Sequence, residues 1–311
     1  MSYTEQQYRR KISLSQKNNA LTTLVAIQLI VFVIFAFMKA VWFYKYQPEH
    51  EVALAFYNKN VLSLFALPAD FGTLVSQPWS LFTHMFIHDN VWAIIPNMLW
   101  LGCFGYILQD LTGNRKLVPV FLYGALAGAL GYMLSFQLMP KLHAQIPGAM
   151  MVGAAPGVMA VAIVTTLVNP GYRIFPMLRG GLPIWVLTAV YVISDIAGVS
   201  LNDPANITAH VAGAAAGLLF ISFLRMGYDG SEWMNKIADW SSNLFDPSRP
   251  RKGHDPKNEL YYKSGTVPFT KTPNVTRERV DEILDKINHK GYHFLTDEEK
   301  EILKKASKED F

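Results

Sequence analysis

Five polar side chains stand out because they lie within or beside long apolar runs of the sequence. They are His84, His88, Asn97, Gln109 and His210. A polar group inside a bilayer is costly, so each of them is a candidate for function. A histidine can accept the proton of a nucleophile, and His84 and His88, four residues apart, could place two metal ligands on one face of a helix. These five side chains could therefore take part in proton transfer, metal binding or hydrogen bonding between helices.

The composition of the 311 residues favours a membrane protein. Apolar residues make up 51% and charged residues only 17%, against about 25% charged in an average soluble domain. The formal net charge is +4, and the chain has no block of like charge of the kind that binds nucleic acid. Cys103 is the single cysteine, so no intramolecular disulfide can form, and no Cys/His spacing is typical of a zinc finger. We expect no cofactor, no bound metal and no nucleic-acid partner.

Six apolar runs are long enough to be membrane spans, which need about 20 helical residues. They lie near residues 20–38, 91–108, 117–139, 150–168, 182–193 and 207–224. Lys and Arg gather before the first run, between the second and third, and between the fourth and fifth, which predicts that both termini are cytoplasmic. The fold class expected is all-α, a six-span helical bundle in a lipid bilayer.

The charged C-terminal part of the chain predicts a second, smaller unit. Thr296 and Glu299 form a capping-box pattern before a short amphipathic helix, and Gly291 suits the end of the helix before it. No nucleophile is paired with a base there, so we expect a structural helical hairpin that could recruit a cytosolic partner. The domains expected are a cytosolic segment at 1–19, the membrane domain at 20–226, a linker at 227–273 and the hairpin at 274–311.

Several short motifs, in a fixed order, resemble the rhomboid family of intramembrane serine proteases. Each motif is weak alone, but their order and spacing together are specific. They are Pro78-Trp79, His84-Met85-Phe86-Ile87-His88, Asn97-Met98-Leu99-Trp100-Leu101, Phe104-Gly105, Gly113-Asn114-Arg115, Gly153-Ala154, Val158-Met159-Ala160 and Ala209-His210-Val211-Ala212-Gly213 with Gly217. The resemblance implies a rhomboid-like six-span bundle.

In that family a serine at the head of the fourth span attacks a peptide carbonyl, and a histidine of the sixth span takes its proton. The resemblance assigns the histidine to His210 and implies that Gly213 and Gly217 let the sixth span approach the fourth. The family stabilises the oxyanion with a histidine and an asparagine four residues apart on the second span, and Asn97 matches the asparagine. It also assigns His88 to hydrogen bonds that hold the loop before that span.

This sequence departs from the family pattern at three positions that matter for catalysis. Ala155 stands at the nucleophile position, and residues 138–193 contain no Ser or Cys to replace it. Ala93 stands where the oxyanion histidine belongs. Pro156 follows the nucleophile position, and it has no N–H and a fixed φ. Because losing a catalytic nucleophile costs roughly 10⁶ in rate, we expect no peptidase activity.

The function expected is therefore that of a pseudoprotease, which binds transmembrane segments of client membrane proteins without cutting them. Two alternatives stay open: an active rhomboid-type serine endopeptidase, and a metal-dependent membrane hydrolase that uses His84, His88 and His210. The C-terminal hairpin resembles a domain attached to some bacterial rhomboids, which suggests a bacterial inner membrane.

Overall fold

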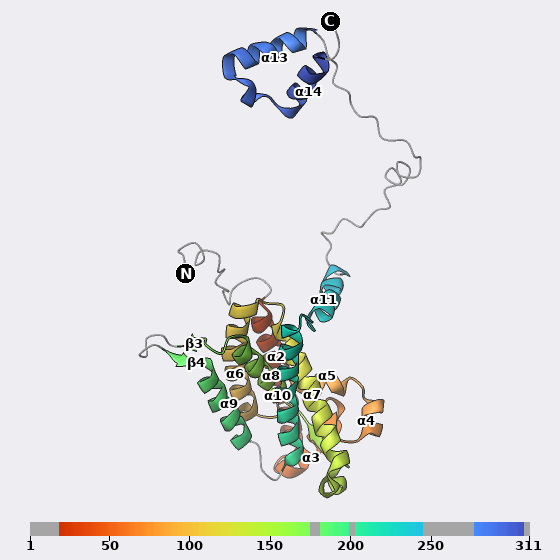
Figure 1. Cartoon of the computed structure of the whole chain (residues 1–311). Helices are drawn as coiled ribbons and strands as arrows, with labels where there is room; N and C mark the ends of the chain where they lie inside the picture. The colour runs from red at the N-terminus through yellow and green to blue at the C-terminus, as the bar shows by residue number, and fades with distance from the viewer. Residues whose placement is uncertain (1–18, 175–180, 199–202, 245–276, 308–311) are drawn as a thin grey trace. The chain divides into compact units, whose positions relative to one another are not determined.

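The computed structural model describes residues 19–174, 181–198, 203–244 and 277–307 (Figure 1). The chain divides into two compact units, Met1–Phe245 and Asp246–Phe311. The first unit contains the apolar runs, and the second contains the charged C-terminal helices. Residues 1–18 of the expected N-terminal segment and residues 245–273 of the expected linker lie outside the described residues.

The first unit is helical over most of its described length. Its helices are Ala20–Lys45 (α2), His50–Asn60 (α3), Phe71–Ser76 (α4), Ser80–Thr83 (α5), Val91–Thr112 (α6), Leu117–Leu138 (α7), Ala155–Val168 (α8), Ile184–Gly198 (α9), Pro204–Arg225 (α10) and Glu232–Leu244 (α11). Short 3-10 turns lie at Leu62–Leu64 (η1), His84–Phe86 (η2) and Pro140–Gln145 (η3). Two antiparallel pairs join β1 (Leu67–Pro68) to β2 (Met150–Met151) and β3 (Arg173–Ile174) to β4 (Leu182–Pro183).

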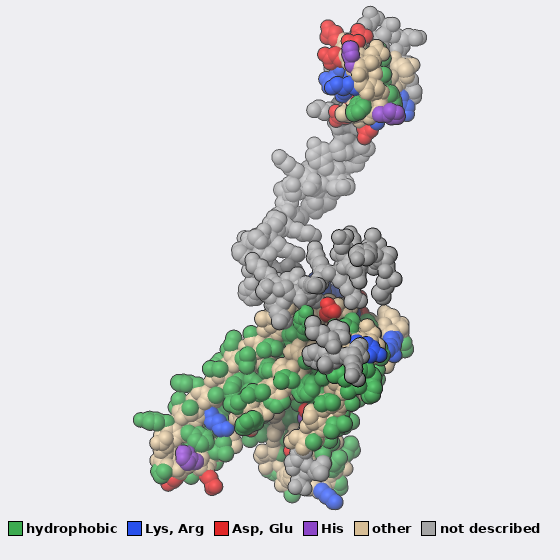
Figure 2. All heavy atoms as spheres, turned by 90° about the vertical axis from the view of Figure 1, so that its left-hand side faces the viewer, with side chains coloured by type: hydrophobic (Ala, Val, Ile, Leu, Met, Phe, Trp, Pro, Cys, Tyr) green, Lys and Arg blue, Asp and Glu red, His purple; other side chains and the backbone are tan. Residues whose placement is uncertain are grey.

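Among the described residues, four helices are long and apolar enough to cross a membrane, namely α2, α6, α7 and α10. Helices α8 and α9 are apolar but have only 14 and 15 residues, which at 1.5 Å per residue is about 21 and 22 Å. Large apolar side chains such as Ile30, Phe37 and Trp92 are exposed on the outside, and hydrophobic side chains cover much of the visible side of this unit (Figure 2). The expected all-helical membrane bundle is confirmed.

The short helix α8 lies inside the bundle, packed against α6, α7 and α10 (Figure 1). Most of its side chains are buried, whereas α2 and α10 keep most of theirs on the surface. Glycines allow this close packing. A Cβ added to Gly124 of α7 would lie 2.4 Å from the Ala160 Cβ, and one added to Gly217 of α10 would lie 2.8 Å from the Ala160 carbonyl oxygen.

Helix α8 begins five residues later than the apolar run predicts. Met150 and Met151 are extended and pair with Pro68 and Leu67, and Gly153 has a φ of +122°, which a residue with a side chain rarely adopts. Hydropathy does not distinguish an apolar strand from an apolar helix. The correct start of α8 is therefore Ala155.

The range expected to be a linker, 227–273, contains helix α11. This helix belongs to the first unit, and six residues separate it from the end of α10. Its described residues are amphipathic, with apolar and charged side chains on different faces. The stretch from 227 to 244 therefore has a structure of its own.

The second unit consists of Arg277–Lys290 (α13), the turn Tyr292–Phe294 (η4) and Asp297–Ala306 (α14). Ile283, Leu295 and Ile302 form its small core. The capping box is confirmed, because the Thr296 hydroxyl accepts from the Glu299 N–H and the Glu299 carboxylate accepts from the Thr296 N–H. Gly291 has a φ of +88° where α13 ends.

Candidate functional site

The head of α8 is the position at which the sequence predicts a lost nucleophile. Ala154 caps the helix, and Ala155 is its first residue. The preceding loop is fixed by a hydrogen bond from the Gly153 N–H to the His84 carbonyl, 3.0 Å long. Ala155 is partly buried, and its side chain is a methyl group, which cannot attack a carbonyl.

Pro156 fills the space between three helices at this point. A Cβ added to Gly128 of α7 would lie 2.4 Å from the Pro156 Cβ, and one added to Gly213 of α10 would lie 2.4 Å from the Pro156 carbonyl oxygen. The added Gly128 Cβ would also lie 3.1 Å from the carbonyl oxygen of Ala209. The head of α8 and the segment of α10 that includes residue 210 are therefore neighbours, and the proline ring packs into their junction.

His210 is hydrogen-bonded, but to a residue that the sequence analysis did not select. Its Nδ1 pairs with the Asp195 carboxylate of α9, and both side chains are largely buried. A histidine whose Nδ1 is held by a carboxylate is fixed in orientation, which is how general bases are positioned in hydrolytic enzymes. Asp195 thus orients the His210 ring, on a segment of α10 whose backbone neighbours the head of α8.

The two expected oxyanion positions are linked to each other. The Asn97 side-chain amide donates to the Ala93 carbonyl over 2.8 Å, so the amide turns back onto its own helix. The hydrogen bonds found among the described residues join neither Ala93 nor Asn97 to α8 or α10. Ala93 has no side-chain donor, so its position supplies none.

Helix α9 contacts the rest of the bundle through one of its faces. Thr188, Tyr191 and Asp195 follow one another at spacings of three and four residues, which places them on one side of the helix. The Thr188 hydroxyl bonds the Thr166 hydroxyl of α8, and the Tyr191 ring packs 5.2 Å from Trp100 of α6, centroid to centroid. The bundle-facing side of α9 is thus a polar and aromatic stripe.

His84 and His88 are both buried, and their rings differ in their contacts. His84 Nδ1 lies 3.0 Å from the Ser80 carbonyl, and the His84 carbonyl holds Gly153. The ring nitrogens of His88 have no hydrogen-bond partner among the described residues. No group of three or more His, Cys, Asp and Glu side chains in the described part of the chain is close enough to hold a metal ion.

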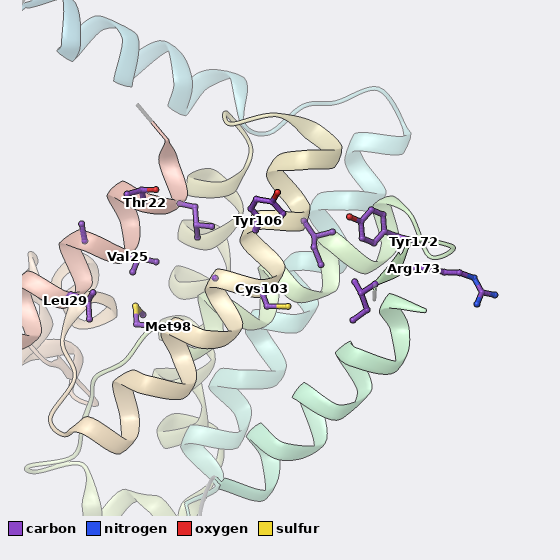
Figure 3. A pocket seen from close by; sticks show the side chains of 13 residues that line it. Thr22, Val25, Leu29, Met98, Cys103, Tyr106, Tyr172 and Arg173 are labelled. Atoms are coloured by element: carbon purple, nitrogen blue, oxygen red, sulfur yellow. The ribbon is translucent and has the colours of Figure 1, made fainter. Parts of the chain in front are cut away.

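A groove of about 960 Å³ lies between α2 and α6 and reaches β3, where Tyr172 and Arg173 line it (Figure 3). Its lining is almost wholly apolar and includes small residues that leave room for a ligand. A Cβ added to Gly102 would meet no atom within 4 Å, which identifies open space. The small residues of this lining are Thr22, Ala26, Gly102 and Cys103.

Asp195 is the site residue that the sequence analysis missed. The apolar run was expected to end near residue 193, which put Asp195 in a loop. The structure extends α9 to Gly198, so the carboxylate points into the bundle. An acidic residue one turn after Tyr191 was the available signal, because an ionisable group inside a membrane helix needs a partner.

Comparison with known families gives two matches. Residues 75–227 match the model of the Rhomboid domain, which extends from the last residues of α4 to just beyond the end of α10. Residues 273–309 match a family of unknown function, which covers the two helices of the second unit. No curated protein matches the chain.

Proposed function

We propose that this integral membrane protein, which the match of residues 75–227 identifies as a member of the rhomboid family, is a pseudoprotease. It binds transmembrane segments of client proteins and leaves them uncut. The observation that carries the proposal is the head of α8, where Ala155 replaces a nucleophile and Pro156 packs against Gly128 and Gly213.

The environment of His210 supports the loss of proteolysis. The histidine has an acidic partner, Asp195, but no serine at the position that it would activate. The hydroxyl of Thr208 on the same helix donates to the Ala205 carbonyl over 2.7 Å, and residues two apart on a helix face different directions. Thr208 is therefore not a substitute nucleophile.

The groove between α2 and α6 supports client binding. Helices associate in membranes through close packing of small residues, and Thr22, Ala26, Gly102 and Cys103 give this groove such a lining. It opens toward the lipid, so a helix could enter it sideways. We place the client segment there.

Two finer points belong to the same proposal. The protein would reside in a bacterial inner membrane with both termini in the cytoplasm, as the distribution of Lys and Arg suggests. The helical hairpin of the second unit would then recruit a cytosolic partner.

One reconstitution experiment tests both parts of the proposal. The chain is placed in liposomes with a rhomboid-type transmembrane segment that carries a photo-crosslinking residue, and cleavage and crosslinking are measured together. We expect the parent chain to crosslink the segment without cutting it. The triple variant Ala155→Ser, Pro156→Gly, Ala93→His should cut it, and adding His210→Ala to this variant should abolish cutting.

Matched variants distinguish the possible outcomes. Gly102→Leu fills the groove and should abolish crosslinking, while Leu99→Phe, at a lipid-exposed position outside the groove, should leave it unchanged. Because Pro156→Gly also removes a packed ring, the double variant that retains Pro156 is measured in parallel. Cleavage by the parent would refute the loss of activity, and equal crosslinking by the Gly102→Leu and parent chains would refute the binding site.

A further inference from the structure

Helix α11 presents an apolar stripe of which more than half is exposed among the described residues. Trp233, Ile237 and Trp240 are 53%, 54% and 64% exposed. Their spacings of four and three residues place them on one face of the helix. Isolated exposed apolar residues are common, but two tryptophans and an isoleucine aligned on an amphipathic helix are an interaction surface.

The charged face of the same helix already has a partner. Asn235, Lys236 and Asp239 line a polar pocket with Arg115 and other residues of the α6–α7 loop. The Arg115 guanidinium lies 3.4 Å from the Asp239 carboxylate. This contact directs the acidic face toward the loop and leaves the apolar stripe free for another surface.

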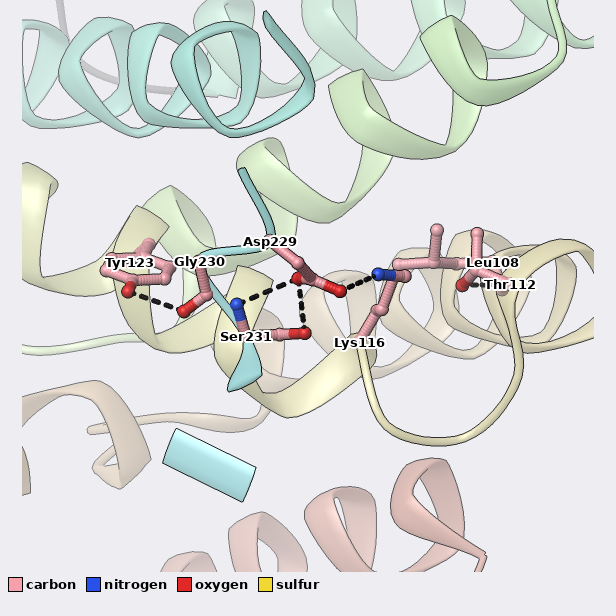
Figure 4. Close-up of polar contacts among 7 residues, drawn as sticks. All are labelled: Leu108, Thr112, Lys116, Tyr123, Asp229, Gly230 and Ser231. Atoms are coloured by element: carbon pink, nitrogen blue, oxygen red, sulfur yellow. Dashed lines mark hydrogen bonds and ion pairs between the residues drawn. The ribbon is translucent and has the colours of Figure 1, made fainter. Parts of the chain in front are cut away.

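The segment between α10 and α11 is fixed to the end of the bundle by a set of polar contacts (Figure 4). The Asp229 carboxylate bonds Lys116 and accepts from the Ser231 hydroxyl and N–H. Burial opposes the ionisation of Asp229, but these hydrogen bonds outweigh it and lower the pKa of the carboxyl group. Tyr123 Oη donates to the Gly230 carbonyl over 2.8 Å.

The first residue of the stripe is hydrogen-bonded to a tyrosine near the start of α7. The Trp233 indole N–H donates to Tyr123 Oη over 2.6 Å. Tyr123 lies six residues after Leu117, the start of α7, and therefore about 9 Å into a helix that is long enough to span the membrane. Trp233 thus contacts α7 within its first two turns, and tryptophan is enriched where membrane helices end at the interface.

The exposed apolar surface at the end of α10 and in the residues that follow it continues toward this helix. Phe223, Met226 and Tyr228 are 49%, 61% and 71% exposed, and Trp233 follows five residues later. The first residue of α2 is held at the same end of the bundle, because the Ala20 N–H donates to Asn114 Oδ1 over 2.7 Å. The stripe therefore extends an apolar surface that already faces lipid.

We propose that α11 binds the surface of the bilayer in which its own chain is embedded, with Trp233, Ile237 and Trp240 inserted at the boundary between headgroups and acyl chains. Amphipathic helices lie in this way when one face is apolar and the other polar. Asp239 pairs with Arg115 of the loop, and Glu232 lies 3.9 Å from Lys236 on α11 itself. The apolar stripe therefore supplies the binding, and anionic lipid is not required. The proposal does not depend on whether the protein is a protease.

Spin labelling of the full chain in liposomes tests this placement. Cys103→Ala removes the single cysteine, and a nitroxide is then attached to Ile237→Cys, Trp240→Cys, Asn235→Cys or Lys236→Cys, one at a time. We expect collisions with oxygen to exceed those with a water-soluble nickel chelate at 237 and 240, and the reverse at 235 and 236. The pattern should be the same in phosphatidylcholine vesicles with and without phosphatidylglycerol.

Three results would overturn the proposal. Equal access of the nickel chelate at all four positions would place α11 in water. Exclusion of both reagents from 237 and 240 would show that protein, a second copy or another partner, covers the stripe. Insertion seen only with phosphatidylglycerol would assign the binding to charge and not to the apolar stripe.

Discussion

At the scale of single residues, the contact between Asp195 and His210 is the most consequential in the membrane domain. Each is an ionisable side chain in an apolar bundle, where an unpaired group is costly. The pair joins α9 to α10 and sets the direction of the imidazole ring. The pair therefore stabilises the fold whether or not His210 accepts a proton in a reaction.

We predict that Asp195→Ala lowers the free energy of unfolding by about 1–3 kcal/mol, the usual cost of leaving a buried polar group without its partner. Asp195→Asn keeps a hydrogen-bond acceptor for Nδ1 and should cost less. Titration with sodium dodecyl sulfate from mixed micelles measures both. Equal stability of the alanine variant and the parent would show that the contact is not made.

The roles of His210 and Asp195 differ in how far the sequence could predict them. His210 could be found because a histidine within a glycine-rich apolar helix is conspicuous. Asp195 could not, since its role depends on where α9 ends and on which helix lies opposite it. The sequence also could not predict that the Asn97 amide bonds the carbonyl of its own helix, because the rotamer of a side chain depends on how its neighbours pack.

At the scale of helices, the bundle depends on glycines at the crossings of α7, α8 and α10. Apolar length predicted where six of the helices lie, because hydropathy measures the preference for lipid. It could not predict the start of α8, since Met150 and Met151 are apolar in a strand as they would be in a helix. It also missed α11, which is too polar to resemble a span.

Gly213→Ala is predicted to destabilise the membrane domain by about 1–3 kcal/mol, the range for overpacking a tight contact. The new methyl group would lie 2.4 Å from the Pro156 carbonyl oxygen, so the helices must separate. Gly102→Ala is the matched control, because its methyl group meets open space and a helical alanine is favoured over glycine by up to about 1 kcal/mol. Unfolding in mixed micelles that ranked the two variants in the opposite order would contradict this packing.

At the scale of the whole molecule, the chain combines a membrane unit with a small charged unit that has its own core. The second unit is stabilised by few apolar residues, so its polar contacts matter more. Lys286 Nζ lies 2.7 Å from the Glu299 carboxylate. The hydrogen bond from Lys286 and those from Thr296 lower the pKa of Glu299.

This pKa shift predicts how the second unit responds to acid. A carboxyl group whose pKa is lower in the folded state stabilises the fold above its unfolded pKa, and the stabilisation is lost as pH falls through the folded value. At pH 7, Glu299→Gln should therefore speed hydrogen exchange of the α14 amides in the full chain. Glu298→Gln, a change in the same turn, is the control and should have little effect.

The pH dependence provides the decisive comparison. When the parent and Glu299→Gln are measured at the same pH, their difference should shrink as the carboxyl group becomes protonated. Mass spectrometry of the exchanging peptides follows this without isolating the unit. A difference that stayed constant into acid would exclude the ion pair as its cause.

The packing of Pro156 has an evolutionary consequence. A reversion of Ala155 to serine would place a hydroxyl beside a proline that still fills the junction with Gly128 and Gly213. A change at Pro156 made first would open a gap there and weaken the bundle before any catalytic advantage appeared. On the proposed function, selection would favour neither substitution alone, so a gain of peptidase activity would require both changes together.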